Sequence, residues 1–464
     1  MPTGIPGMDQ ILNGGLLKGS IYLVQGSAGA GKTILANQIS FNWAAAGRKA
    51  TYITLLSESH ARMLQHMEMF SFYQENAIPR ALRYISAFDG LAREGLPGLM
   101  GVLTHEMHER KVDLLVLDGL VTAAGASGSA QELKLFIAQI QAMSALTGCT
   151  VLLLNSVSAS AAHSTPEQTM VDGIIMLRQQ VVRSRHERTV EIVKFRGSSV
   201  VHAAHTFRIG SQGIVLFPQL ETVLGRGPVA PINARVSTGV PGLDAMIHGG
   251  YPIGSTTAIT GPEGSGKSLA GLQFLSQASA REPALLFAFE ESIDAAEAVG
   301  ETFGLNLRSL VGDGLLHLWG RPTLGSSESL DEVGYRLLTA VKSTGARRVF
   351  VDGLGSLFAT AAYEQRGAAF FAALFKELRR AGATSLFSVR LGHDGSAPVL
   401  AGEVSPLMDN VVRLSVSEQH QKLVRSVSIG KVQVSLQDLS IRELELTTSG
   451  LRVQRPVDEE GAPT

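Results

Sequence analysis

Two short glycine-rich segments have the residue types and spacing of phosphate-binding loops. Each fits G-x-x-x-x-G-K-[ST], in which backbone N–H groups curl around an anion and the lysine reaches the β- and γ-phosphates of a nucleotide. Each follows an apolar strand and opens a helix, whose positive N-terminal end favours an anion. The expected ATP-binding residues are Gly26, Ser27, Ala28, Gly29, Ala30, Gly31, Lys32 and Thr33 in one loop, and Gly261, Pro262, Glu263, Gly264, Ser265, Gly266, Lys267 and Ser268 in the other.

An aspartate ends an apolar segment downstream of each loop. Asp118 closes the segment LLVLD and Asp352 closes VFVD, and a glycine follows both. Beside a phosphate loop, such a carboxylate orients Mg²⁺ through water, and the last hydroxyl of the loop binds the ion directly. The alternative is a strand-end aspartate that caps a turn. The expected Mg²⁺ ligands are Thr33, Asp118, Ser268 and Asp352.

Carboxylates that follow the second strand of each half are candidates for a general base. In the second half, Glu290 and Glu291 end the apolar segment ALLFAF, and one of them could polarise the attacking water or hydroxyl. In the first half the matching stretch holds a single carboxylate, Glu58. Glu58 could act as the base, or could complement the positive N-terminal end of the helix that follows it.

The chain is internally duplicated. The segment TGIPGMD at residues 3–9 recurs as TGVPGLD at residues 238–244, and the loops and aspartate-ending strands follow in the same order. Such self-similarity indicates two copies of one structural unit. A stretch rich in glycine and proline at residues 225–236 has the composition of a linker. We therefore expect two domains, residues 1–228 and 229–464.

Short apolar segments alternate with helical stretches in each half. Strands that are apolar throughout and alternate with helices predict a parallel sheet covered on both faces. From residue 173 to 217 strands follow one another closely, which predicts an antiparallel extension of that sheet. The fold class is α/β. In the first half we expect strands at 21–25, 50–55, 113–118 and 150–155, and helices at 32–46, 59–72, 98–110 and 129–146.

Composition narrows the classes of function. The chain has 464 residues, 45% of them hydrophobic, and a net charge of −1, so nothing predicts general attraction to nucleic acid or anionic membranes. The single cysteine, Cys149, lies in an apolar stretch and fits a buried thiol in a reducing compartment. With no signal-peptide pattern and no apolar run of about 18 residues, we expect a cytoplasmic protein without membrane contact.

Several residues are not expected to do chemistry. The twelve histidines include no H-E-x-x-H pattern. His60, His66, His105 and His108 fall on amphipathic helices, where a surface or core role is the simpler interpretation. The segment at 156–165 occupies the place of a ring-lining loop but lacks the cationic and aromatic residues that a nucleic-acid channel needs.

Together these segments resemble the KaiC family, the circadian-clock branch of the RecA/DnaB-like ATPases, over nearly the whole chain. The resemblance rests on the repeated TGIPGMD-type segment, both loops, the Glu-Glu-Ser after the second strand, and the aspartate-ending strands. It implies two tandem RecA-like P-loop NTPase domains. It also implies a homo-oligomer, typically a hexamer of two stacked rings, with nucleotide bound between subunits.

A late segment of the first half, Lys194-Phe195-Arg196-Gly197-Ser198, looks like the family's K-x-R-G-[ST] element. In the family this element reaches the γ-phosphate bound by the neighbouring subunit, where a cation neutralises charge in the transition state. The alternative is that these residues form an ordinary solvent-exposed face of a strand. In the second half the lysine is kept as Lys431, but Gln433 replaces the arginine and cannot supply its charge.

The resemblance and its departures suggest two specialised rings. In the first half Ser57 stands where the family has its first glutamate. We expect a slow ATPase in the first ring, and tight ATP binding with poor turnover, or slow Ser/Thr autokinase activity, in the second. Ser405-Pro406 takes the place of the family's phosphorylated Ser-Thr pair, so Ser405 is either an acceptor or an ordinary loop serine.

We therefore expect a KaiC-like ATPase in signalling, with a signalling protein as partner, rather than a circadian oscillator. Two other functions stay open at this point. One is a scaffold whose subunits are held together by ATP with little turnover. The other is a DNA motor, which the absence of a basic, aromatic channel loop disfavours.

Overall fold

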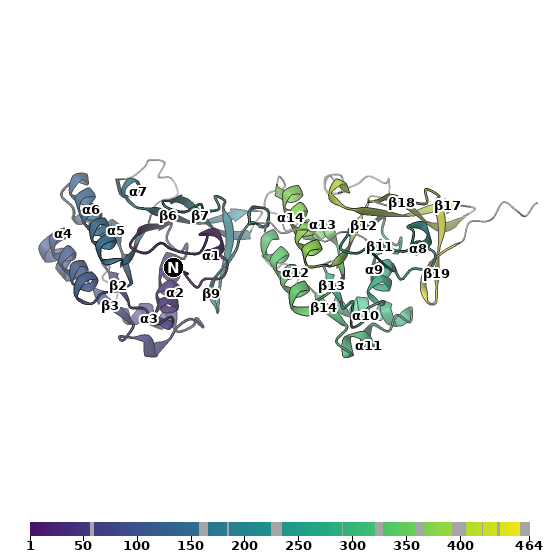
Figure 1. The fold of residues 1–464 in the computed structure, drawn as a ribbon, viewed down its shortest axis with the longest axis horizontal. Helices are drawn as coiled ribbons and strands as arrows, with labels where there is room; N and C mark the ends of the chain where they lie inside the picture. The colour runs from purple at the N-terminus through teal and green to yellow at the C-terminus, as the bar shows by residue number, and fades with distance from the viewer. Residues whose placement is uncertain are drawn as a thin grey trace, which may run out of the picture. The chain divides into compact units, whose positions relative to one another are not determined.

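The computed structural model divides the chain into two compact units, Met1–Val223 and Leu224–Thr464 (Figure 1). The boundary expected at residue 228 falls in 224–233, outside the described residues. The residues described are 1–55, 60–156, 166–182, 185–223, 234–289, 291–320, 328–358, 366–391, 405–419, 421–433 and 437–454.

Helices and strands alternate through most of each unit. In the first unit the elements are α1 (Met8–Ile11), β1 (Ile21–Gly26), α2 (Lys32–Ala45), β2 (Ala50–Thr54), α3 (His60–Met67), η1 (Glu75–Ala77), β3 (Leu82–Ser86), α4 (Phe88–Thr104), η2 (His105–Glu109), β4 (Leu114–Asp118), α5 (Leu120–Ala126), α6 (Ala130–Thr147), β5 (Thr150–Ser156), α7 (Pro166–Met170), β6 (Gly173–Val182), β7 (Arg185–Phe195), β8 (His205–Gly210), β9 (Gly213–Phe217) and η3 (Leu220–Thr222). In the second unit they are β10 (Arg235–Val236), α8 (Leu243–Met246), β11 (Tyr251–Pro252), β12 (Thr256–Gly261), α9 (Lys267–Leu275), β13 (Ala284–Ala288), α10 (Ile293–Thr302), α11 (Leu307–Gly312), β14 (Leu316–Gly320), α12 (Leu330–Thr344), β15 (Arg348–Asp352), α13 (Leu354–Phe358), α14 (Gly367–Arg380), β16 (Thr384–Arg390), η5 (Ser405–Leu407), β17 (Asn410–Gln419), β18 (Lys422–Val432), β19 (Arg442–Thr447) and β20 (Gly450–Val453).

Each unit is built on a mostly parallel sheet. The first has the strand order β3-β2-β4-β5-β1-β6-β7-β8-β9, and the second the equivalent order β14-β13-β15-β16-β12-β17-β18-β19-β20. Pairing is parallel from β3 to β6 and from β14 to β17, and antiparallel beyond. The predicted α/β fold, two RecA-like domains with antiparallel extensions, is confirmed.

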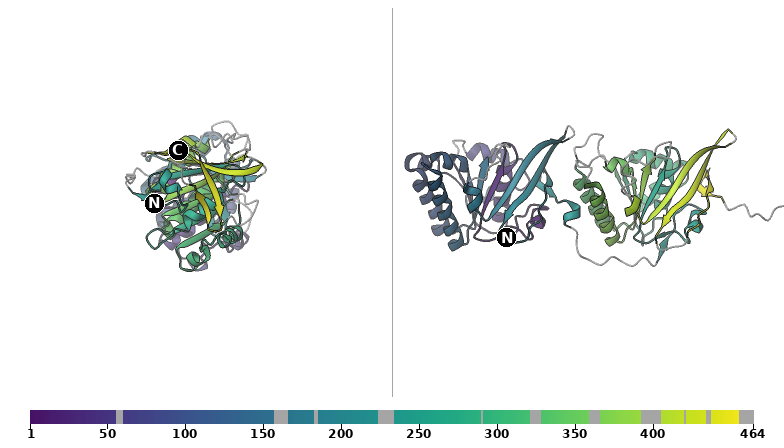
Figure 2. Two further views of the ribbon diagram at one scale, coloured as in Figure 1. Left: turned by 90° about the vertical axis from the view of Figure 1, so that its right-hand side faces the viewer. Right: turned by 90° about the horizontal axis from the view of Figure 1, so that it is seen from above.

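The strands carry apolar side chains on both faces because helices cover both. Along β1, Tyr22 and Val24 join the core on the α2 side, whereas Ile21 and Leu23 join the core with α4, α5 and α6. Cys149 is buried in the latter core, and burial raises the pKa of its thiol to about 12. In both units the long antiparallel hairpin lies on the opposite side of the unit from the outer helices, as the β17–β18 hairpin does from α12 and α14 (Figure 2).

The expected elements differ from the structure in several places: the helix expected at 59–72 ends at Met67, the short helix α5 was not expected, and the largest differences are at β3 and α4. The strand β3 was not expected, because its side chains are only partly buried and its sequence, LRYIS, lacks a long apolar run. The helix expected at 98–110 begins earlier, at Phe88, and ends in the π-helical turn η2. Gly95 interrupts α4 with φ 65° and ψ −152°, and Pro97 follows. Helix-breaking residues therefore concealed the first part of this helix.

The repeated TGIPGMD-type segment joins the start of each unit to its last strand. The backbone N–H and hydroxyl of Thr3 donate to Asp9 Oδ1 at 2.7 and 2.8 Å, which closes the turn. Leu216 N on β9 then donates to Pro6 O at 3.0 Å. In the second unit Val453 N on β20 donates to the oxygen of Pro241 at 2.8 Å. The most visible repeat in the sequence thus has a structural role.

Gly7→Ala is expected to lower the free energy of unfolding of the first unit by about 3 kcal/mol. Gly7 has φ 79°, and a Cβ there would lie 2.4 Å from Leu216 O. Gly14→Ala is the matched control, since Gly14 has φ 112° but no atom within 4 Å of its Cβ position. It should cost only the backbone strain, about 1 kcal/mol. Pulse proteolysis in urea, read from peptides of residues 1–223, measures both, and equal losses would contradict the close approach.

Among the described residues, no helix combines the length and the apolar character that crossing a bilayer requires.

Candidate nucleotide-binding sites

The first phosphate loop connects β1 to α2 at the carboxyl edge of the parallel strands. Gly29 and Gly31 take left-handed backbone conformations, with φ 76° and 105°, and Ala30 N donates to Ser27 O at 3.2 Å to close the turn. No neighbouring atom lies within 4 Å of a Cβ position at Gly29, so the space above the loop is open. This backbone fits a phosphate group held by N–H donors.

Lys32 is folded into this loop. Its side chain is buried, and its ammonium donates to Gly26 O at 2.8 Å and to Ser27 O at 2.9 Å. Burial lowers the pKa of Lys32, and the nearby charge of Asp118 opposes that shift. A partly desolvated lysine held against the loop backbone is suited to the β- and γ-phosphates of a nucleotide.

A hydroxyl and a carboxylate meet beside Lys32. Thr33 Oγ1 lies 3.5 Å from Asp118 Oδ2, and the Tyr52 hydroxyl donates to the same oxygen at 2.7 Å. Burial raises the pKa of Asp118, while the Tyr52 hydrogen bond and the Lys32 charge act to lower it. Oxygen ligands of this kind are those that Mg²⁺ prefers. The two residues predicted as metal ligands are therefore adjacent.

Tyr52→Phe is expected to lower the local stability of β2 and β4 by about 1–2 kcal/mol, because Asp118 loses a buried donor. The pKa of Asp118 should rise further, since a hydrogen bond that lowers it is removed. Hydrogen exchange of first-unit peptides measures the loss, with peptides of the second unit as reference. Tyr73→Phe is the control, because its hydroxyl has no hydrogen bond to any residue that the structure describes. An equal effect of both variants would contradict a specific role for the Tyr52 hydroxyl.

The second loop has the same pair with a different supporting residue. Lys267 Nζ donates to Pro262 O at 2.7 Å, and Ser268 Oγ lies 3.4 Å from Asp352 Oδ2. The Ser388 hydroxyl on β16 donates to Asp352 Oδ1 at 2.5 Å. Strand register gives the Tyr52 position to Leu286, which has no donor. The carboxylate of the first site is thus held from β2, and that of the second from β16.

The candidate bases follow β2 and β13. Glu58 and Glu290 lie outside the described residues, and Glu291 is exposed. Leu55 N donates to Asp118 O and Phe289 N to Asp352 O, both at 2.9 Å, so Leu55 and Phe289 are equivalent.

Counting on from these equivalent residues separates the two halves. Glu290 follows Phe289 directly, whereas Leu56 and Ser57 stand between Leu55 and Glu58. By this count Glu58 corresponds to Ser292, whose hydroxyl accepts a hydrogen bond from Ala295 N at 3.1 Å and caps α10. The count favours the alternative that Glu58 complements the positive N-terminal end of the following helix over a role as base.

The strand that carries Lys194 and Arg196 has a counterpart in the second unit. Arg196 N donates to Asp172 O at 2.8 Å, and Gln433 N donates to the oxygen of Asp409 at 3.0 Å. The preceding strand pairs also share an irregularity at the same place, between Ile174 and Ile175 and between Val411 and Val412. Gln433 therefore occupies the backbone position of Arg196.

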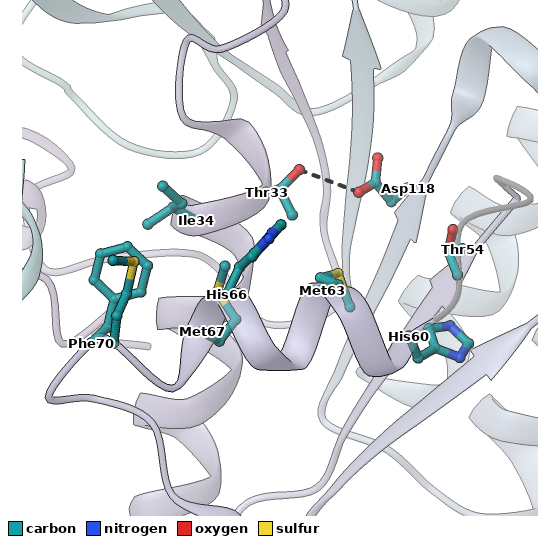
Figure 3. Close-up of a pocket in the computed structure, with 10 residues that line it drawn as sticks. Thr33, Ile34, Thr54, His60, Met63, His66, Met67, Phe70 and Asp118 are labelled. Carbon is teal, nitrogen blue, oxygen red and sulfur yellow. Dashed lines mark hydrogen bonds between the residues drawn. The ribbon is translucent and has the colours of Figure 1, made fainter.

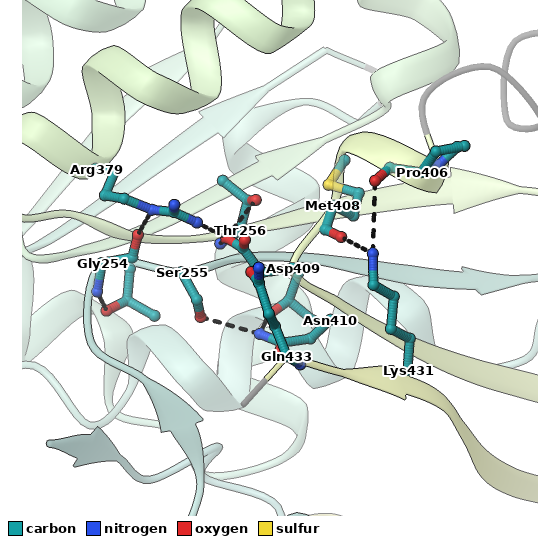
Figure 4. Close-up of polar contacts among 12 residues, drawn as sticks. Gly254, Ser255, Thr256, Arg379, Pro406, Met408, Asp409, Asn410, Lys431 and Gln433 are labelled. Carbon is teal, nitrogen blue, oxygen red and sulfur yellow. Dashed lines mark hydrogen bonds and ion pairs between the residues drawn. The ribbon is translucent and has the colours of Figure 1, made fainter. Parts of the chain in front are cut away.

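The lysines of these strands make similar contacts. Lys194 Nζ donates to Thr169 O at 3.0 Å, and Lys431 Nζ donates to Met408 O at 2.8 Å (Figure 4). Burial and the charge of Arg196 lower the pKa of Lys194. Arg196 itself is exposed. In both units the lysine thus binds a main-chain oxygen of its own unit, while Arg196 extends into solvent.

Asp409 supports this strand. Its carboxylate accepts a hydrogen bond from Thr256 N at 2.8 Å and pairs with Arg379 (Figure 4). Asp172 accepts a hydrogen bond from Ile21 N at 3.0 Å in the first unit. Each aspartate fixes the start of the loop-bearing strand to the strand beside it, so its role is structural.

A pocket beside Thr33 and Asp118 was not expected from the sequence. It has a volume of about 320 Å³, and α3 contributes His60, Met63 and His66 to its wall (Figure 3). The helical spacing of these residues places them on one face, and this was the available signal. Residues 157–165, most of the segment that takes the place of a ring-lining loop, lie outside the described residues.

Known proteins with similar sequences span both units. A family profile described as "ATPase: KaiC" matches residues 1–221 and 236–458. The chain is 25% identical to the circadian clock oscillator protein KaiC of Prochlorococcus marinus (strain MIT 9313), over 98% of this chain and 92% of that protein. It is 26% identical to KaiC of Parasynechococcus marenigrum (strain WH8102), over 98% and 90%, and 26% identical to KaiC 1 of Synechocystis sp. (strain ATCC 27184 / PCC 6803 / Kazusa), over 97% and 88%. The chain therefore belongs to the KaiC ATPase family.

Proposed function

We propose that this chain binds MgATP in both phosphate loops and hydrolyses it slowly, mainly in the first unit. The observation that carries the proposal is the same arrangement in two places. A loop lysine lies beside a hydroxyl–carboxylate pair, Thr33 with Asp118 at 3.5 Å and Ser268 with Asp352 at 3.4 Å. Membership of an ATPase family supports it.

Each residue has a defined part in this proposal. The loop N–H groups and Lys32 hold the phosphates and offset their charge, and Thr33 and Asp118 hold the metal ion. When bound, Mg²⁺ supplies charge neutralisation at the β- and γ-phosphates. A carboxylate, Glu58 in the first unit and Glu290 or Glu291 in the second, accepts the proton of the attacking water as the bond between the γ-phosphorus and the ADP oxygen breaks.

We further propose that the sites are completed across subunit boundaries in a homo-hexamer. Arg196 is exposed in its own unit, so its guanidinium, which suits phosphate oxygens, is accessible to a neighbouring subunit. Gln433 at the equivalent position is neutral, so the second ring should hold ATP but turn it over poorly. We propose that such a ring acts in signalling by binding a protein partner.

A second candidate for the second unit is an ATP-dependent assembly element with little turnover, and Gln433 favours it. Autokinase activity is the third, with Ser405, the first residue of η5, as the acceptor. Intact-mass spectrometry after incubation with ATP, alongside released phosphate, separates them. Phosphate release without a gain in the mass of the chain supports hydrolysis. A gain in mass that Ser405→Ala abolishes supports the autokinase. If neither phosphate release nor a gain in mass is seen, the assembly element is the remaining candidate.

A further inference from the structure

The pocket in the first unit lies where a bound γ-phosphate would face α3. Two of its lining residues are Thr33 and Asp118, the pair proposed to hold the metal ion. Lys32 is not among the described residues that line this pocket, and its ammonium donates to the oxygens of Gly26 and Ser27. A nucleotide whose metal ion is held by Thr33 and Asp118 would present its terminal phosphate oxygens to this pocket.

The wall formed by α3 offers two imidazoles and no lysine or arginine. The residues that line the pocket in the described part of the chain include His60 and His66 as their only nitrogen-bearing side chains. His60 is fixed by packing, with its ring 5.9 Å from that of Tyr84, and burial lowers its pKa. The His60 ring therefore has little freedom to move toward a ligand.

His66 is the residue that can reach a ligand. It is exposed on α3, and its side chain rises from the helix toward Thr33 (Figure 3). No described residue forms a hydrogen bond with its ring. Met67, next to it, is buried and anchors the helix against the unit. The imidazole thus lines the same pocket as Thr33 and Asp118, with its ring nitrogens available to a ligand there.

We propose that His66 donates a ring N–H to a γ-phosphate oxygen of ATP in the first unit, and so makes this site prefer ATP to ADP. The inference rests on the proposed function, because it requires nucleotide in the first loop. At the equivalent position of α10 in the second unit, counted from the equivalent residues Leu55 and Phe289, stands Gly300, which has no side chain to donate a hydrogen bond. Discrimination by His66 is therefore specific to the first unit.

The test measures binding rather than turnover. The parent protein is the full chain with Lys267→Ala, which leaves only the first site. Calorimetry in the presence of Mg²⁺ gives its Kd for two ligands: ADP, and a non-hydrolysable ATP analogue with an imido-linked γ-phosphate. His66→Ala should weaken binding of the analogue about tenfold, as expected for a hydrogen bond to a charged group, and ADP binding less than about twofold. His66→Gln keeps an N–H donor and should recover most of the loss. His108→Ala, at an exposed histidine of η2, is the matched control.

Three results would overturn the inference. Unchanged Kd values for both ligands in His66→Ala would rule out the γ-phosphate contact and leave the proposed function intact, because the analogue still binds. Equal weakening of both ligands would assign His66 to the shape of the site. Failure of the parent Lys267→Ala chain to bind either ligand would instead overturn the proposed function, and the inference with it.

Discussion

Lys32→Ala is expected to lower ATP turnover by the whole chain about 100-fold, whereas Lys267→Ala lowers it less than about twofold. The loss of Lys32 removes the buried cation that faces the phosphates in the unit that keeps Arg196. The loss of Lys267 affects the unit in which Gln433 has replaced the arginine, so little turnover is there to lose. The asymmetry follows from the second-unit substitution rather than from any difference between the loops, whose lysines both donate to main-chain oxygens.

Phosphate release at saturating MgATP measures this asymmetry. Lys134→Ala on α6 and Lys342→Ala on α12 are controls, because each removes an exposed lysine of the same unit away from the loop. Both controls should keep the parental rate. If Lys267→Ala is the variant that stops turnover, the proposed division of labour is reversed. If neither variant changes turnover, hydrolysis does not occur at these loops.

Arg196→Ala is expected to lower turnover of the first unit about 1000-fold, the low end of the effect of an arginine finger. Gln433→Arg is expected to raise turnover of the second unit, measured in a chain that carries Lys32→Ala. Arg196 N donates to Asp172 O, and Gln433 N donates in the same way to Asp409 O. The Gln433→Arg substitution therefore places an arginine at the position equivalent to Arg196. Arg178→Ala, which removes a half-exposed arginine paired with Glu191 at 2.9 Å, is the control for loss of charge.

Mixing distinguishes a contact within one subunit from a contact between subunits. Neither Lys32→Ala nor Arg196→Ala chains should turn over ATP appreciably in their first unit when assayed alone. In mixed assemblies some boundaries combine an intact loop with an intact Arg196, so part of the activity should return. Arg196 would be acting within its own subunit, or not at all, if mixing restores nothing.

Much of the architecture was predictable because the chain repeats itself. The order of the loops and aspartate-ending strands predicted the two sheets, and the close succession of strands after residue 173 predicted the antiparallel ends. The missed elements have physical causes. β3 is an edge strand without a long apolar run, and Gly95 and Pro97 mask the first turns of α4.

The site was predictable where chemistry depends on consecutive residues, and not where it depends on packing. The loop spacing identifies Lys32 and Thr33 directly. The hydrogen bond from Tyr52 to Asp118 depends on the register between β2 and β4, and the placement of His66 depends on how α3 packs against β3. The spacing of His60, Met63 and His66 indicates that they share a face of the helix, but not that this face meets a ligand.

Binding stoichiometry tests the central claim, that each unit holds its own magnesium-bound nucleotide. Calorimetric titration of the full chain with the non-hydrolysable ATP analogue and Mg²⁺ should give about two nucleotides per chain, about one for Lys32→Ala or Lys267→Ala alone, and none for the double variant. Unaltered stoichiometry in the double variant would contradict the account, because the nucleotide would then be bound somewhere other than these loops.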